Sequence, residues 1–286
     1  MENETKGRSF LVETWRRLIK SKVTVVSMLI IALIVLAAVF APLLAPYGYE
    51  EQFKSRALEG SSRDFLLGTD RVGRDVLSRL LYGARQSLSM GVIAVIGSTV
   101  VGIFFGAIAG YYGGVVDGLI MRVLDVFQGV PMFLLTVTLA AVLGPSLRNA
   151  IIAIGITMIP GNARMMRASI LSVREMEYIE AAKSIDAGVP RIILKHIIPN
   201  AIAPIIVSFT MGLGGAVLSG SGLSFIGLGV QAPIPEWGAM ISDGRNLMRQ
   251  APQLALYPGI CVMLTVIAFN MLGDGLRDAL DPRLKS

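Results

Sequence analysis

The chain alternates between long apolar runs and short charged segments from residue 23 onward. Six runs contain no Asp, Glu, Lys or Arg: 23–45, 86–116, 126–147, 149–163, 197–235 and 250–273. About 20 apolar residues cross a bilayer as one helix, so this pattern predicts an all-α, polytopic membrane protein. We place its six transmembrane helices at 23–45, 86–116, 126–147, 149–163, 201–219 and 250–273.

Three stretches depart from the length of a simple span. Run 86–116 would be about 46 Å long as one helix, against about 30 Å of hydrocarbon, which predicts a tilted or broken helix. Run 149–163 would reach only about 22 Å, so its flanks must supply length while Arg148 and Arg164 extend their side chains outward. The glycine-rich stretch 220–229 is expected to be an extended or re-entrant piece buried against other helices.

Basic residues beside the first run set the expected orientation. Arg16, Arg17, Lys20 and Lys22 precede that run, and positive charge collects on the cytoplasmic side. The basic residues of the next polar segment oppose this tendency, but the reverse orientation would place the charged stretch 178–188 outside the cytoplasm, where the apolar-flanked basic segment that contains it is not expected. The predicted order is a cytoplasmic N-terminus 1–22, the first helix 23–45, an extracytoplasmic loop 46–85, a core 86–273 with a cytoplasmic loop 164–199, and a cytoplasmic tail 274–286.

Composition supports a membrane protein and gives no sign of nucleic-acid binding. Apolar residues make up 53% of the chain and charged residues 16%, against about 25% charged in soluble domains. The net charge of +6 comes from basic residues that flank apolar runs, without aromatic residues for base stacking among them. Cys261 lies inside an apolar run, which indicates packing. Trp237 is expected to anchor an outer loop at the membrane interface.

Sequence motifs for nucleotide, metal or acyl-transfer chemistry are missing. No Gly-Lys dipeptide occurs, which excludes the phosphate loop G-x-x-x-x-G-K-[ST]. His196 is the one histidine and has no Cys, His or acidic set at metal-ligand spacing, so we interpret it as structural. The sequence therefore predicts no catalytic residue and no metal site.

Small and charged residues near the second and third runs indicate helix packing. Gly102, Gly106 and Gly110 repeat at four-residue spacing, which places them on one helix face and lets another helix approach closely. We favour ordinary packing over a role in gating. Arg122 and Asp125 are three residues apart at the edge of the third run, so they can pair on one helix face. A solvated pair is favoured there over an intramembrane relay.

The charged segment 164–195 lies between the fourth and fifth predicted spans, in the cytoplasm. Ser172 and Glu175 have the spacing of a capping box, which predicts a helix that continues through residue 187. Gly188 suits a left-handed cap at its end, and Pro190 suits the first turn of a following helix. The apolar residues of this helix do not share one face, so we expect it to contact both a partner and the chain's own membrane part.

The charged segment resembles the EAA loop of bacterial ABC importer permeases, which docks on the ATP-hydrolysing subunit. The resemblance is carried by Glu180, Ala181 and Ala182, followed by Pro199. Further stretches are similar to the C-type permease subunit of the dipeptide, oligopeptide and nickel importers. These stretches are 67–79, 235–238 and 273–283.

The resemblance covers nearly the whole chain and implies a role for each residue of the loop. Glu180 would be the polar anchor, and Ala181 and Ala182 would allow close approach to the ATPase. The turn would be shaped by Asp186, Gly188 and Pro199. One departure occurs, because Asp186 occupies a position where the family usually has Gly. Asp tolerates turn conformations, so the turn is expected to be kept or slightly shifted.

The resemblance also implies a type I ABC importer permease fold with six transmembrane helices, in the bacterial inner membrane, with both termini cytoplasmic. The implied partners are a homologous B-type permease, two ABC ATPase subunits, an extracytoplasmic peptide-binding protein and membrane lipid, with no nucleic acid. ATP and Mg²⁺ would bind to the ATPase subunits. This chain would hold no cofactor and would not itself be an enzyme.

Di- and oligopeptides are the expected solutes, with nickel or another small solute as the alternative, since no residue identifies a substrate-binding site. A stand-alone secondary transporter would need charges at mid-span, and the six runs contain none. A membrane enzyme would need a catalytic set, which we do not find. The sequence therefore favours a transport subunit driven by a separate ATPase.

Overall fold

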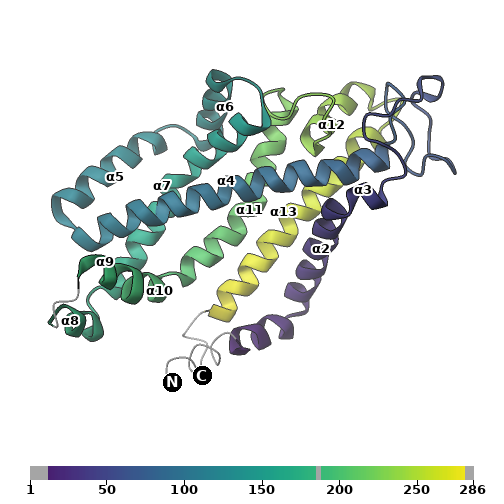
Figure 1. Ribbon diagram of the computed structural model, residues 1–286. Coiled ribbons are helices and arrows are strands. Elements are labelled where there is room, and N and C mark those ends of the chain that lie inside the picture. The colour runs from purple at the N-terminus through teal and green to yellow at the C-terminus, as the bar shows by residue number, and fades with distance from the viewer. Residues whose placement is uncertain (1–11, 185–187, 281–286) are drawn as a thin grey trace.

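The computed structural model describes residues 12–184 and 188–280, which fold into helices and loops (Figure 1). No strand occurs among these residues beyond an isolated antiparallel bridge between Thr69 and Asp75. The long helices are α2 (Lys22–Val39), α4 (Val76–Tyr112), α5 (Gly114–Gln128), α6 (Met132–Leu143), α7 (Leu147–Val173), α11 (Ala203–Phe225) and α13 (Gln253–Leu280). The short ones are α3 (Ala41–Leu44), η1 (Lys54–Arg56), α8 (Glu177–Ser184), α9 (Val189–Ile192), η2 (Ile193–Ile197), α10 (Ile198–Ala201), α12 (Trp237–Gly244) and η3 (Arg245–Leu247).

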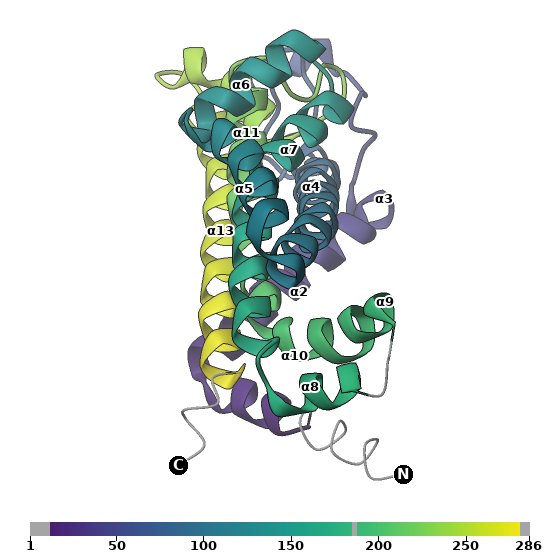
Figure 2. The ribbon, with the colours of Figure 1, turned by 90° about the vertical axis from the view of Figure 1, so that its left-hand side faces the viewer.

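The long helices form an elongated bundle with distinct ends. Figure 2 shows α6 at one end of this bundle and α8 with α9 at the other. The end of α13 and the start of α2 lie at the same end as α8 (Figure 1). The loop 45–75 and α12 lie at the end that carries α6 (Figure 1). The two ends of the described chain and the predicted docking segment therefore share one end.

Side-chain caps and glycines define where the long helices begin and break. The Asp75 carboxylate accepts a hydrogen bond from the Ser78 N–H at 2.7 Å and starts α4, while Ser146 starts α7 in the same way through Asn149 at 3.1 Å. These caps satisfy N–H groups that have no partner within the helix. Gly113 separates α4 from α5 with a φ of 66°, a conformation that favours glycine.

The core of the bundle lies where α4, α7 and α11 meet. The most extensive helix contact joins α4 to α7, followed by α11 with α13 and α11 with α4. Met90, Ile154 and Leu223 are fully buried in this core. A second apolar cluster at the α8 end buries Met166 and Ile170 of α7.

Four helices are long and apolar enough to cross a membrane: α2, α4, α11 and α13. The third predicted span, 126–147, contains α6 but only the last turn of α5, which begins at Gly114, and the two helices are bent by 84°. The Gly129-Val130-Pro131 sequence explains this bend, since proline disfavours helix at the residue before it. The fourth predicted span is α7, which also contains Arg148, Arg164 and Arg167. Six predicted spans are thus compatible with four apolar helices, the bent pair and α7.

Several helix boundaries differ from the predicted spans. Helix α4 begins ten residues before 86 because Asp75 caps it, so the loop before it ends at residue 75 instead of 85. Helix α7 extends to Val173 and α13 to Leu280, beyond their apolar runs. Much of the stretch 220–229 is not extended, because α11 continues through Phe225 and ends before Gly227, whose φ is 85°.

Candidate functional site

The predicted docking segment forms α8, α9 and α10, with a π-helical turn between the last two. Ile179 of α8 is fully buried, and Ala182 is 7% exposed. Both pack in the apolar cluster that includes Ile192. Glu180 and Ala181 are exposed. One face of α8 therefore fixes it to the bundle, while the other presents Glu180 and Ala181 to the surroundings.

The helix predicted from Ser172 through residue 187 begins later than expected. Ser172 lies inside α7, and its hydroxyl donates to the Ser169 carbonyl at 2.7 Å instead of capping a new helix. The chain turns after Val173, and α8 begins at Glu177. Capping spacing is a local signal, and here the continued hydrogen bonding of α7 overrides it.

The turn after α8 differs from the predicted left-handed cap. Gly188 has φ −55° and ψ 142° and begins α9, with Pro190 in the first turn of that helix as expected. Asp186 lies outside the described residues. Pro199 is exposed in the first turn of α10. The roles proposed for these residues toward an ATPase stay predictions.

The three glycines of α4 lie directly against α7. A Cβ atom added at Gly102 would lie 2.5 Å from the Asn162 Cβ atom, and one at Gly106 would lie 2.4 Å from the Ala163 carbonyl oxygen. A Cβ atom at Gly110 would lie 3.0 Å from the Ile170 Cβ atom. The two helix backbones approach too closely for side chains at these positions.

Ion pairs join α5 to α7 near the α8 end. Asp117 accepts two hydrogen bonds from the Arg167 guanidinium, and Asp125 pairs with Arg164. The predicted pairing of Arg122 with Asp125 is therefore wrong: Arg164 from another helix takes the place of Arg122. These contacts join charges far apart in the chain, so no local spacing rule could find them.

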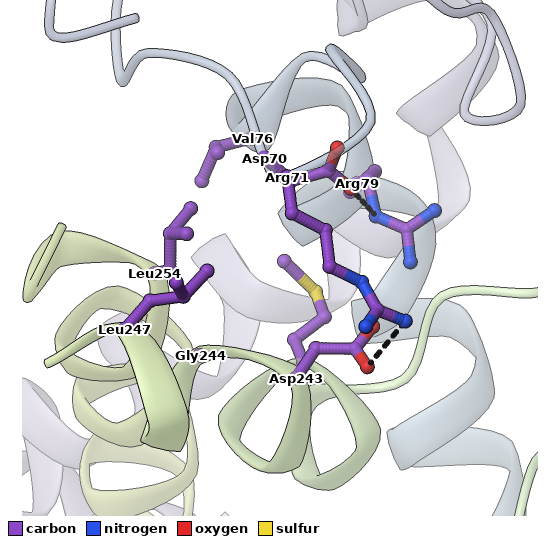
Figure 3. A pocket seen from close by; sticks show the side chains of 9 residues that line it. Asp70, Arg71, Val76, Arg79, Asp243, Gly244, Leu247 and Leu254 are labelled. Atoms are coloured by element: carbon purple, nitrogen blue, oxygen red, sulfur yellow. Dashed lines mark ion pairs between the residues drawn. The ribbon is translucent and has the colours of Figure 1, made fainter. Parts of the chain in front are cut away.

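A charged cluster at the opposite end holds the loop 45–75 against α4 and α12. Figure 3 shows Arg79 directed toward Asp70, with 3.6 Å between charged atoms, and Arg71 toward Asp243, at 3.5 Å. Arg79 also donates to the Tyr49 and Pro233 carbonyls. The charged side chains that line the small pocket in Figure 3 thus form ion pairs within the protein, which indicates a structural role for them.

The loop 45–75 has an ordered interior of its own. Phe53 and Phe65 pack with Tyr47, and the Arg56 guanidinium lies 4.6 Å from the centre of the Phe65 ring. Arg56 also donates to Glu59 at 2.5 and 2.6 Å, and these hydrogen bonds lower the pKa of the Glu59 carboxyl. The loop is therefore a folded platform at this end of the bundle.

Glu236 forms a buried polar junction that the sequence interpretation missed. Its side chain is fully buried and accepts hydrogen bonds from the Ser87 hydroxyl at 2.8 Å and the Ser221 hydroxyl at 3.2 Å. It also caps α12 through the Ala239 N–H. Trp237 is not an interface anchor, because it is 2% exposed and its indole donates to the Leu80 carbonyl at 3.1 Å. Glutamate is not among the residues that usually cap helix N-termini, so no local sequence signal could have found this junction.

Several apolar helices of membrane-spanning length and one bent pair define the class of multi-pass membrane proteins, and a partly exposed helical segment lies at one end of the bundle. Residues 102–286 match the family described as the binding-protein-dependent transport system inner membrane component. Residues 9–60 match the N-terminal transmembrane domain of oligopeptide transport permease C. The chain belongs to this family of binding-protein-dependent transport permeases and is a multi-pass membrane protein.

Curated relatives cover nearly the whole chain. A dipeptide transport system permease protein of Alkalihalophilus pseudofirmus is 48% identical over 96% of this chain and 90% of its own length. A glutathione transport system permease protein of Pectobacterium atrosepticum is 42% identical over 96% and 91%. A di/tripeptide transport system permease protein of Pseudomonas aeruginosa is 42% identical over 96% and 93%. These matches confirm the resemblance to the C-type permeases.

A solved structure shows the same fold. A chain of the MetNI methionine ABC transporter, in its inward-facing conformations, matches with a TM-score of 0.57 and 17% identity. The match covers 71% of this chain and 96% of that chain. The expected all-helical ABC importer permease fold is confirmed.

Proposed function

We propose that this chain is the C-type transmembrane subunit of an ATP-driven, binding-protein-dependent importer of di- and oligopeptides. The names of its relatives support this substrate class, since they refer to dipeptide, di/tripeptide and glutathione transport, and glutathione is itself a tripeptide. A homologous B-type permease would complete the translocation path. An extracytoplasmic peptide-binding protein would deliver the solute.

Two ABC ATPase subunits would bind the end that carries α8. They would hold ATP and Mg²⁺, while this chain would hold no cofactor. This end would face the cytoplasm, so both termini would be cytoplasmic and the folded loop 45–75 would lie outside. Lipid would surround the apolar helices.

The observation that carries this proposal is the division of α8 into a buried face and an exposed face. Ile179 is fully buried, so a partner that displaces α8 through exposed Glu180 would also displace the helices of the bundle. Arg174 lies between α7 and α8, and its guanidinium donates to the Gly110 carbonyl at 2.9 Å, where α4 ends. Closure of an ATPase dimer against α8 would thus move α7 and α4 together.

A charge reversal on the exposed face of α8 and a bulky substitution just before α9 test the proposal. Glu180→Arg and Gly188→Trp should insert and assemble normally but lose stimulation of ATPase activity by solute-loaded binding protein. A Cβ atom at Gly188 meets no other atom within 4 Å, so its replacement leaves the chain's own packing intact. Asp278→Arg is the matched control, because Asp278 is exposed on α13 outside α8. Undiminished peptide transport by both Glu180→Arg and Gly188→Trp would refute the proposal.

A further inference from the structure

A groove runs along α7 and α11 from the bend between α5 and α6 toward the α8 end. Its first part is a hollow of about 500 Å³ lined by residues of α5, α6, α7 and α11. Its second part is a hollow of about 780 Å³ between α7, α10, α11 and α13. The two parts share Met158, Met165 and Ser208, so they form one continuous groove. Each is within the range of about 300–1,000 Å³ that small-molecule sites occupy.

The groove combines methionines with uncharged polar side chains. Met132, Met158, Met165 and Met211 line it. Methionine is flexible and polarizable, so it adapts to ligands of different shape. A solute with variable side chains is the kind of occupant that such a lining fits.

The polar groups of the groove suit peptide main-chain atoms. The Asn162 amide is fixed by donating to the Ser98 hydroxyl at 3.2 Å and the Thr99 hydroxyl at 3.4 Å, and its carbonyl oxygen can accept a peptide N–H. Gln128 is exposed at the bend and offers both a donor and an acceptor. The half-buried hydroxyl of Ser208 has no hydrogen-bond partner in the described chain.

Charged side chains are nearly absent from the lining of the groove, which favours a peptide over a metal cation as its solute. Among the described residues that line the groove there is no Asp, Glu, His, Cys or Lys, and Arg277 at its far end is the one charged residue. Divalent transition metals take imidazole, thiolate or carboxylate ligands, which this lining lacks. Away from Arg277, the lack of fixed charge also keeps a bound peptide weakly held, so that it can be released. Arg277 can attract a peptide carboxylate at the end of the groove.

An adjacent hollow provides a contrast. It lies between α4, α5 and α7 and is lined only by apolar side chains, among them Phe105, Leu119 and Pro160. It offers no side chain that could pair with an amide group. Polar side chains are therefore a property of the groove and not of every hollow in the bundle.

We propose that this groove is the translocation surface contributed by the chain and that it carries a short peptide through contacts with its main-chain amides, not a metal cation. This inference rests on the proposed function, since it takes an importer of small solutes as given. It names the residues of this chain that contact the solute and explains why peptides with different side chains are transported.

A bulky residue at Gly161 tests the groove without disturbing the packing. Gly161 lines the groove, and a Cβ atom there meets nothing within 4 Å. Gly97 on α4 has the same open surroundings and lies outside the groove, so Gly97→Phe is the matched control. The complete importer, with its permease partner, ATPase subunits and binding protein, is reconstituted in liposomes. Uptake of Gly-Gly and Trp-Trp is measured for each variant.

We expect Gly161→Phe to reduce Trp-Trp uptake about tenfold more than Gly-Gly uptake, because the narrowed groove discriminates by size. An equal reduction of both would reveal a purely structural defect and would overturn the inference, and Gly97→Phe should change neither. If the Gly161→Phe variant takes up both peptides as fast as the unmodified importer does, the inference is overturned. An unmodified importer that transports neither peptide would instead refute the proposed function.

Thiol labelling provides a second measurement that does not depend on a bulky substitution. In a Cys261→Ser background, which removes the one native thiol, Ser208→Cys is exposed to a water-soluble methanethiosulfonate reagent during ATP turnover. Excess Gly-Gly should slow labelling by a factor of about three or more. Protection by Ni²⁺ but not by Gly-Gly, or no protection by either, would overturn the inference.

Discussion

Substitution of Gly106 by alanine tests how closely α4 and α7 must approach. The added Cβ atom would lie 2.4 Å from the Ala163 carbonyl oxygen, 2.7 Å from the Met166 Cβ atom and 3.1 Å from the Arg167 nitrogen. Carbon atoms in ordinary contact are about 3.5–4.0 Å apart. Both helices must therefore separate to admit a single methyl group.

The size of the effect follows from two opposing contributions. Overpacking of a close contact costs about 1–3 kcal/mol, whereas alanine is favoured over glycine in a helix by about 1 kcal/mol. Gly97→Ala on the same helix gains only the second contribution, because its Cβ atom meets nothing within 4 Å. The difference between the two variants thus isolates the steric contribution, and Gly106→Ala should be less stable than Gly97→Ala by about 1–3 kcal/mol.

Reversible unfolding in mixed detergent micelles measures this difference as a free energy of unfolding. Gly110→Ala provides an internal gradient, since its Cβ atom would lie 3.0 Å from the nearest atom of α7, and its effect should fall between the other two. If Gly106→Ala and Gly97→Ala stabilise the protein equally, the close approach of α4 and α7 does not require glycine, and the reasoning is wrong.

Three further predictions concern the polar contacts of the bundle. Glu236→Ala should destabilise the protein by about 2–4 kcal/mol, because it removes the α12 cap and the acceptor for Ser87 and Ser221; Glu236→Gln, which retains an acceptor, should lose less in the same unfolding assay. In a Trp15→Phe variant the emission of Trp237 should be blue-shifted and resist quenching by acrylamide, since Trp237 is 2% exposed, and emission typical of water-exposed indole would contradict its burial. Asp117→Arg should reduce coupled ATPase activity and Arg167→Asp should restore it in the double variant, because these charges pair between α5 and α7; failure of the exchange would show that the pair has no role in coupling.

The positions of the membrane helices could be predicted from the sequence because apolar runs reflect the bilayer directly. Their ends could not, since helix ends depend on partners elsewhere in the chain. Helix α4 begins at Val76, in a charged stretch, because Asp75 caps it and Arg79 finds the Tyr49 and Pro233 carbonyls. Neither carbonyl has a sequence signature.

The bend between α5 and α6 was predictable in principle. Gly129 and Pro131 interrupt an otherwise uniform run, and such residues mark breaks; the run length alone favoured one straight span. Trp237 shows the opposite case. Its amphipathic character is typical of an interface residue, but burial with a hydrogen bond to the Leu80 carbonyl satisfies the same indole N–H.

The predicted docking segment came from a resemblance to a family, while the burial of its residues required the structure. Glu180 and Ala181 share the exposed face of α8, and Ala182 lies on the buried side. The motif alone does not distinguish these environments, because burial is decided by contacts with Ile192 and Met166 from other helices.

The ion pair between Asp125 and Arg164 lies on the surface of the chain. Its side chains are 56% and 45% exposed, and Arg164 lies about 14 Å along α7 from its end at Val173. Salt screens exposed charges, so this link between α5 and α7 should weaken as ionic strength rises. The less exposed pair of Asp117 with Arg167 should keep the two helices joined under the same conditions.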